Sequence, residues 1–335
     1  VRRAAADALA SGSIGYTDAL GIAELRAAIS RHYADHYGLE VPAARIAVTT
    51  GSSAGFNLAF LAMFEAGDRV AITVPGYPAY RNIMKALGLD VVEIGHPGEG
   101  HLTASRLIQA HREKQLKGVL FASPANPTGA TIPAGDLRDL IEAARAHGIA
   151  VISDEIYHRL NYVAPDVSAL AFGADVVAIN SFSKYYCMTG WRIGWMVLPE
   201  ALVRQVERLQ QSLYISAPEL SQRAAVAAFD ADGELEAVRS RYETNRALLV
   251  ERLPRLGLPL AAPMDGAFYA YCDVSNHSND SMEFARQMLH EAGVAATPGR
   301  DFDPVDGARY MRFSYAGAPA AIVEAMERLE RWLVR

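Results

Sequence analysis

Lysine and cysteine are both scarce in this chain of 335 residues. Its two cysteines, Cys187 and Cys272, are far apart and match no paired metal-ligand spacing. Such cysteines are typical of free thiols in a reducing compartment, so we expect a cytoplasmic protein. Arginine carries almost all of the positive charge, because only four lysines occur: Lys85, Lys114, Lys117 and Lys184.

Long apolar runs and charged tracts are absent as well. No segment approaches the roughly 18 apolar residues that a membrane-spanning helix needs, and the opening VRRAAADALASG lacks the apolar core of a signal peptide. The 32 basic and 38 acidic residues give a net charge of −6 without a basic stretch, so we expect neither nucleic acid nor a membrane as a partner. A small molecule is the default ligand.

Short apolar runs alternate with helix-like segments in the first part of the chain. The predicted strands are RIAVTT, DRVAITV, GVLFAS, AVISDE, DVVAINSF and GWRIGWMVLP. Alternation of this kind predicts parallel strands joined by crossover helices, which is an α/β domain. Because the runs are apolar almost throughout, we expect helices on both faces of the sheet.

The regular alternation ends at about residue 245. Beyond it, GAFYAYCDV and ARYMRFSYA predict strands, while SMEFARQMLHEAG and AAIVEAMERLERWLVR predict helices. We therefore expect a large cofactor-binding domain over residues 12–245. A smaller α+β domain would comprise residues 246–335 together with residues 1–11.

Three predicted strands end in side chains that can do chemistry. GVLFAS leads to Asn126 in SPANPTG, AVIS leads to Asp154 and Tyr157 in DEIY, and DVVAINSF leads to Lys184. Ligands bind outside the carboxyl ends of parallel strands, so we expect these side chains to share one crevice.

A phosphate site is predicted beside them. RIAVTT runs into GSSAGF, where Ser52 and Ser53 open a helix whose free N–H groups suit an anion. Ser181 and Arg192, on either side of the lysine segment, add a hydroxyl group and a cation.

Together these groups suit pyridoxal 5′-phosphate. A lysine amine with a lowered pKa forms a Schiff base with an aldehyde, and this cofactor supplies both the aldehyde and the phosphate. Lys184 would carry the cofactor, Asp154 would pair with its ring nitrogen, and Tyr157 and Asn126 would hold its phenolate oxygen. Tyr77, in VPGYPAY, would stack on the ring.

Each of these features alone also has a structural interpretation. An isolated lysine often lays its stem over apolar neighbours, a carboxylate after a strand often caps the next element, and NPTG is turn chemistry. Tyr77, and also Tyr16 in the segment GYTDALG, could be packing residues without a ligand. His32 and His36 have helical spacing but no third ligand, so we interpret them as solvent-facing histidines and expect no metal site.

The motifs NPTG, DEIY, SFSK and GWRIGW, in this order, resemble those of the class I/II aminotransferases of fold type I. The similarity extends from about Gly15 to the C-terminus. It implies a mostly parallel seven-stranded sheet with helices on both faces and a smaller C-terminal domain. In the family this lysine holds pyridoxal 5′-phosphate as an aldimine and shuttles a proton, which gives Lys184, Asp154 and Tyr157 catalytic roles.

The resemblance also implies further roles. Arg312, in YMRFSYA, matches the arginine that binds the substrate α-carboxylate, with Asn126 beside it, and Tyr16 matches a tyrosine that reaches the phosphate of a neighbouring subunit. A homodimer with shared sites is therefore expected. The family usually has a longer arm before GYTDALG, so we expect further residues upstream of Val1.

The expected reaction is a ping-pong exchange of an amino group between an L-amino acid and a 2-oxo acid. Dicarboxylate-specific members carry an arginine in the stretch that matches QSLYISAP, and this chain has none there. We therefore expect alanine, aliphatic or aromatic substrates in preference to aspartate. Two alternatives stay open, namely C–S lysis by β-elimination and a non-enzymatic cofactor-binding module.

Overall fold

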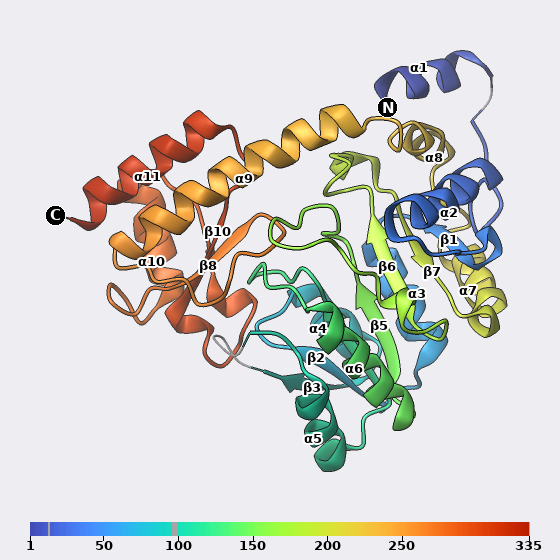
Figure 1. Ribbon diagram of the computed structural model, residues 1–335, viewed down its shortest axis with the longest axis horizontal. Helices are drawn as coiled ribbons and strands as arrows, with labels where there is room; N and C mark the ends of the chain where they lie inside the picture. Colours follow the sequence, from blue (N-terminus) through green and yellow to red (C-terminus); the bar gives the residue numbers. More distant parts are fainter. Residues whose placement is uncertain (13, 96–99, 335) are drawn as a thin grey trace.

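Two sheets organise the computed structural model, which describes residues 1–12, 14–95 and 100–334 (Figure 1). The large sheet has seven strands in the order β1-β7-β6-β5-β4-β2-β3. Neighbouring strands from β6 to β3 are parallel, whereas β7 is antiparallel to both β1 and β6. The strands are β1 (Ile46–Thr49), β2 (Arg69–Thr73), β3 (Asp90–Ile94), β4 (Gly118–Ala122), β5 (Ala150–Asp154), β6 (Val177–Ser181) and β7 (Gly194–Val197).

Helices cover both faces of this sheet, as the apolar runs predict. Along β4 the side chains alternate, so that Leu120 joins one buried cluster while Val119 and Phe121 join another. One face packs against α3 (Ser52–Met63), α4 (Pro78–Ala86) and α7 (Glu200–Leu213). The other face packs against α2 (Ala23–Tyr37), α5 (Ala104–Lys114), α6 (Ala134–Ala146) and α8 (Glu219–Val226).

Strand β3 lies outside the six runs that the sequence pattern identified. It forms the edge of the sheet beside β2, where Asp90 and Glu93 are exposed and only Ile94 is fully buried. An edge strand is partly exposed to solvent and can carry polar residues, so the sequence DVVEI lacks the continuous apolar pattern of the central strands. The mostly parallel seven-stranded fold is confirmed.

The C-terminal region forms a small antiparallel sheet in the order β8-β10-β9. Its strands are β8 (Tyr269–Asp273), β9 (Thr297–Pro298) and β10 (Tyr310–Ser314), and its helices are α9 (Asp232–Arg255), α10 (Ser281–Gln287) and α11 (Pro319–Leu333). Ala270 and Cys272 of β8 pack into the core that these helices close. Because side chains alternate along a strand, Tyr269 and Tyr271 point to the opposite face.

Short turns complete the secondary structure. A π-helical turn, η4 (Met288–Ala292), continues α10. The 3₁₀ turns are η1 (Ala43–Arg45), η2 (Ala169–Ala171), η3 (Thr189–Trp191), η5 (Gly299–Asp301) and η6 (Gly307–Arg309). Among the described residues, no helix combines the length and the apolar composition needed to cross a membrane.

Two observations bear on the expected domain division. Helix α9 continues without a break through residue 245, and Figure 1 shows it reaching from the small sheet toward α8. Helix α1 (Arg2–Ala10) packs against α8, and Ala5 belongs to the core cluster around α2. Helix α1 therefore contacts elements within residues 12–245, although residues 1–11 were expected to belong with the small domain. The exact boundary stays a prediction.

The expectation for His32 was wrong. Its side chain is buried in α2 among aromatic rings, with Phe229 at 5.3 Å and Trp195 at 6.3 Å between ring centroids. Burial, and to a lesser extent the neighbouring His36, lower the pKa of His32 to about 3. His32 is thus a neutral core residue. The described part of the chain contains no group of three or more His, Cys, Asp or Glu side chains suited to a metal ion.

Candidate active site

A cavity of about 270 Å³ lies at the carboxyl ends of β4, β5 and β6, between the large sheet and β8 and β10. All but two of the site residues predicted from the sequence line it. Those that do are Ser52, Ser53, Tyr77, Asn126, Asp154, Tyr157, Lys184, Arg192 and Arg312. Asn126, Asp154 and Lys184 converge because β4, β5 and β6 are neighbours in the sheet and end at the same edge.

Lys184 follows β6 and points into this cavity. Its Nζ lies 5.6 Å from the ring centroid of Tyr157 and 5.7 Å from that of Phe268. Burial lowers the pKa of Lys184 from its usual value, Asp154 partly opposes this effect, and Arg312 lowers the pKa further. At any given pH the amine is therefore more often neutral, and more nucleophilic, than that of a surface lysine.

Asp154 is the last residue of β5 and is 2% exposed. Its Oδ1 accepts the N–H of Ile156 at 3.0 Å, and its Oδ2 accepts the hydroxyl of Tyr80. Burial raises the pKa of Asp154 to about 6, although both hydrogen bonds act in the other direction. A buried carboxylate on a cavity wall is stabilised by a cationic partner, and a protonated pyridine nitrogen is such a group.

A candidate anion site lies at the start of α3. Gly51 precedes the helix with φ of 76°, and no side chain caps the first N–H groups. A Cβ at position 51 would collide with Nη2 of Arg192, which shows how closely the guanidinium approaches the helix terminus. Ser183 also lines the cavity, with its Oγ 3.4 Å from Nη1 of Arg192. Open N–H groups next to a guanidinium bind phosphate well.

Arg312, on β10, supplies a second cationic group. Its guanidinium carbon lies 4.2 Å from the ring centroid of Tyr269 and 4.7 Å from that of Phe302. Nη1 donates to Oδ1 of Asn126 at 2.8 Å, and Nη2 donates to Oγ1 of Thr297 at 3.2 Å. Hydrogen bonds among the described residues use one N–H of each terminal nitrogen, so a second N–H on each can pair with a carboxylate.

Ser181 and Tyr16 do not line the cavity. Ser181 is 2% exposed, and its Oγ accepts the N–H of Ser183 at 3.1 Å, so it supports the wall from behind. Tyr16 is 84% exposed on the outer surface. Its segment is held by hydrogen bonds from Gly15 N–H to Glu219 and from Thr17 N–H to Ser216. Any role for Tyr16 at an active site would require a second subunit.

Two tyrosines in the site were missed. Tyr80, one turn after Tyr77 on α4, donates to Asp154, and its pKa is raised by burial. Tyr269 on β8 lies with its hydroxyl 2.9 Å from that of Tyr157. Tyr77 immediately precedes α4 and Tyr80 follows Tyr77 by three residues, and this spacing is the one signal that could have identified Tyr80.

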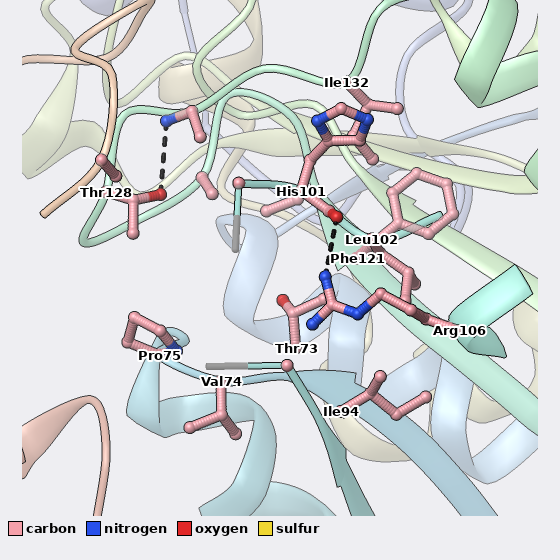
Figure 2. A pocket seen from close by; sticks show the side chains of 16 residues that line it. Thr73, Val74, Pro75, Ile94, His101, Leu102, Arg106, Phe121, Thr128 and Ile132 are labelled. Atoms are coloured by element: carbon pink, nitrogen blue, oxygen red, sulfur yellow. Dashed lines mark hydrogen bonds between the residues drawn. The ribbon is translucent and has the colours of Figure 1, made fainter. Parts of the chain in front are cut away.

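A separate pocket lies between the ends of β2 and β4, as Figure 2 shows. Thr73, Val74 and Pro75 form one side, and Thr128 and Ile132 form the other. This pocket shares no described lining residue with the cavity around Lys184. The amine of Lys184, the carboxylate of Asp154 and the guanidinium groups of Arg192 and Arg312 do not line this pocket.

Comparison with known proteins agrees with this chemistry. The family model for aminotransferase class I and II matches residues 1–329. The valine–pyruvate aminotransferase of Mycobacterium tuberculosis is 47% identical over 99% of this chain and 87% of its own length. The (5-formylfuran-3-yl)methyl phosphate transaminase of Methanocaldococcus jannaschii is 36% identical over 97% of this chain and 85% of its own length.

Solved structures give the same result. The crystal structure of an aminotransferase from Mycobacterium tuberculosis superposes with a TM-score of 0.95 at 47% identity, covering 99% of this chain and 87% of that one. The Thermus thermophilus aspartate aminotransferase with maleate gives 0.91 at 33% identity, covering 98% and 87%. These relatives give no support to the β-elimination alternative. The chain belongs to the class I and II aminotransferases, which use pyridoxal 5′-phosphate, and the acid, amine and anion site of its cavity fit that cofactor.

Proposed function

We propose that this protein transfers an amino group from an L-amino acid to a 2-oxo acid in two half-reactions of a ping-pong mechanism, with pyridoxal 5′-phosphate held by Lys184. The observation that carries the proposal is the position of Lys184, whose pKa is lowered by burial, between the buried Asp154 and Arg312. One amine with a lowered pKa, one acid and one carboxylate clamp are what each half-reaction requires.

The bound cofactor supplies an aldehyde for attachment and a ring that accepts electrons. Asp154 holds a proton on the ring nitrogen. The N–H groups at Ser52 and Ser53, with the guanidinium of Arg192, bind the phosphate. The amine of Lys184, when it is not attached to the cofactor, would take the proton from the substrate α-carbon.

Asn126 and Tyr157 hold the phenolate oxygen of the cofactor. The amide oxygen of Asn126 already accepts a hydrogen bond from Arg312 at 2.8 Å. Its amide N–H groups therefore remain to donate toward the cofactor. The same hydrogen bond fixes the guanidinium of Arg312, which receives the substrate α-carboxylate. Tyr77 also lines the cavity, where its ring can stack on the cofactor.

The cavity favours substrates with one carboxylate. Among the described residues that line it, the cationic side chains are Lys184, Arg192 and Arg312. Each has a role with the cofactor or the α-carboxylate, so this chain supplies none of them to a second carboxylate of a substrate in the same cavity. We therefore propose alanine, aliphatic or aromatic substrates in preference to aspartate. The names of the relatives support this preference, because the valine–pyruvate aminotransferase is 47% identical to this chain and the aspartate aminotransferase of Thermus thermophilus is only 33% identical.

Single half-reactions test both parts of the proposal. The visible absorbance of the cofactor-loaded protein is followed after addition of valine, alanine, phenylalanine or aspartate, and again after addition of pyruvate. We expect the band to disappear with the first three at least about tenfold faster than with aspartate, since an unpaired second carboxylate costs desolvation, and to return with pyruvate. Aspartate reacting fastest would contradict the preference. No change with any amino acid would contradict transamination, and Lys184→Ala is the inactive control.

A homodimer with shared sites is the assembly that we propose. Ile14, Tyr16, Leu213 and Ile215 are exposed apolar side chains on two segments joined by the hydrogen bonds of Gly15 and Thr17. An apolar surface of this kind is typical of a subunit interface. Sedimentation of the loaded protein should give twice the chain mass of 36.2 kDa, and a single-chain mass would contradict the dimer.

We also propose a cytoplasmic location. Cys187 and Cys272 are both free thiols, which suits a reducing compartment. Recovery of the native protein in a secreted or periplasmic fraction of its cells would contradict this.

A further inference from the structure

We propose that Tyr269 is a positioning residue that connects the substrate-binding arginine to the tyrosine that holds the cofactor. Its ring contacts the guanidinium of Arg312, and its hydroxyl contacts the hydroxyl of Tyr157. This inference rests on the proposed aminotransferase function, because it assigns Arg312 to the substrate carboxylate and Tyr157 to the cofactor.

The small sheet determines the first contact. β8 and β10 are antiparallel neighbours with Tyr269 opposite Ser314, so Arg312 occupies the diagonal position on the same face. There the guanidinium carbon lies 4.2 Å from the ring centroid of Tyr269 and 4.7 Å from that of Phe302. Two aromatic contacts restrict the orientation of the guanidinium, whose N–H groups can still donate to a carboxylate.

The second contact joins the two domains. The hydroxyls of Tyr269 and Tyr157 are 2.9 Å apart, and these residues are 5% and 4% exposed. One hydrogen lies between the two oxygens. If Tyr269 donates it, the hydroxyl hydrogen of Tyr157 is directed away toward the cavity and the phenolate oxygen of the cofactor. In such a chain each hydrogen bond polarises the next, so Tyr157 becomes a stronger donor.

The ring and the hydroxyl of Tyr269 therefore have separable effects. The ring sets the orientation of Arg312 and should control the affinity for the substrate carboxylate. The hydroxyl acts through Tyr157 on the electron distribution of the cofactor, and should control the pH at which its visible absorbance changes.

Two substitutions separate these effects. Tyr269→Phe keeps the ring and removes the hydroxyl, and Tyr269→Leu keeps apolar bulk and removes both the aromatic face and the hydroxyl. The loaded protein is titrated with pH to locate the midpoint of the absorbance change. It is also titrated with 2-methylalanine, which carries an α-carboxylate but has no α-hydrogen to lose, to measure its dissociation constant.

For Tyr269→Phe we expect the midpoint to rise by about half a pH unit, because a weaker donor stabilises the negative oxygen less. We expect the 2-methylalanine dissociation constant to change by less than about twofold. For Tyr269→Leu we expect the same rise in midpoint and an increase in the dissociation constant of roughly tenfold.

Tyr271→Phe is the matched control. Tyr271 lies two residues further along β8 on the same face, but its ring stacks on Tyr310 and it does not line the cavity. Neither readout should change in this variant. An unchanged midpoint in Tyr269→Phe, or equal dissociation constants in Tyr269→Phe and Tyr269→Leu, would overturn the proposal. Because neither readout needs turnover, a protein that binds the cofactor but transaminates nothing would refute the proposed function without affecting this test.

Discussion

At the scale of single residues, the site holds an acid and an amine that burial pushes toward their neutral forms. Burial raises the pKa of Asp154 to about 6 and lowers the pKa of Lys184. Both shifts mean that the charged groups are disfavoured in the folded protein before the cofactor arrives. The cofactor, with a ring nitrogen for the acid and an aldehyde for the amine, removes that disadvantage.

Replacing Asp154 should change how stability depends on pH in the cofactor-free protein. The folded pKa of Asp154, about 6, is above its usual 3.8, so its stabilising contribution is complete below 3.8 and is lost as the pH rises through 6. The Asp154→Asn variant has no carboxyl group at this position, so it does not lose this stabilising contribution as the pH rises. Between about pH 4.5 and pH 8, the free energy of unfolding of the variant should therefore rise relative to the parent by about 2 kcal/mol, measured by urea unfolding. A difference that stays constant with pH would contradict the assignment.

The sequence was sufficient for those residues that follow apolar strands directly. Lys184, Asp154 and Asn126 could be placed together because parallel strands end at one edge. Tyr269 could not, because its partner Tyr157 is 112 residues away and the contact depends on how the small sheet packs. Ser181 shows the opposite case. It is only three residues from Lys184 in the sequence, but its side chain is buried at the end of β6 and does not line the cavity.

At the scale of secondary structure, the start of α3 and the start of β7 lie together at the proposed phosphate site. A Cβ at Gly194, the first residue of β7, would lie 3.0 Å from the backbone nitrogen of Ser52. Gly51 has φ of 76° and ψ of 167°, a conformation that only glycine adopts without strain. The glycines thus allow the strand, the helix terminus and Arg192 to meet.

Gly51→Ala should therefore weaken cofactor binding. The new methyl group displaces Arg192 from the helix terminus and adds about 1–3 kcal/mol of backbone strain, so we expect the cofactor dissociation constant to rise at least about tenfold. Gly38→Ala is the matched control, because Gly38 also has a positive φ, 66°, but no atom within 4 Å of its Cβ position. That variant should lose about 1 kcal/mol of stability and keep its affinity. Equal affinities in the two variants would contradict the anion site.

Elements with one consistent pattern were predictable, and elements whose pattern depends on neighbours were not. The central strands are apolar on both faces because helices cover both sides. β3, as an edge strand, loses half of that signal, and the placement of α1 on α8 is a tertiary contact between small residues such as Ala5. Nothing in the local sequence of α1 specifies its partner.

At the scale of the whole molecule, the active site exists because two domains meet. The large sheet supplies the amine, the acid and the anion site, and the small sheet supplies Arg312 and Tyr269. The change of pattern at about residue 245 already predicted a smaller second domain, and the resemblance of the motifs agreed with it. The order of strands in the sheet, in contrast, does not follow from local patterns alone. α9 spans the region between the domains as one helix (Figure 1).

The most direct test of the account is to locate the lysine that bears the cofactor. Borohydride reduction of the loaded protein, followed by mass mapping of its peptides, identifies that lysine among the four in the chain. We predict modification of Lys184 alone, with Lys85, Lys114 and Lys117 unmodified. Modification of any of those three instead, or of none, would contradict the central claim.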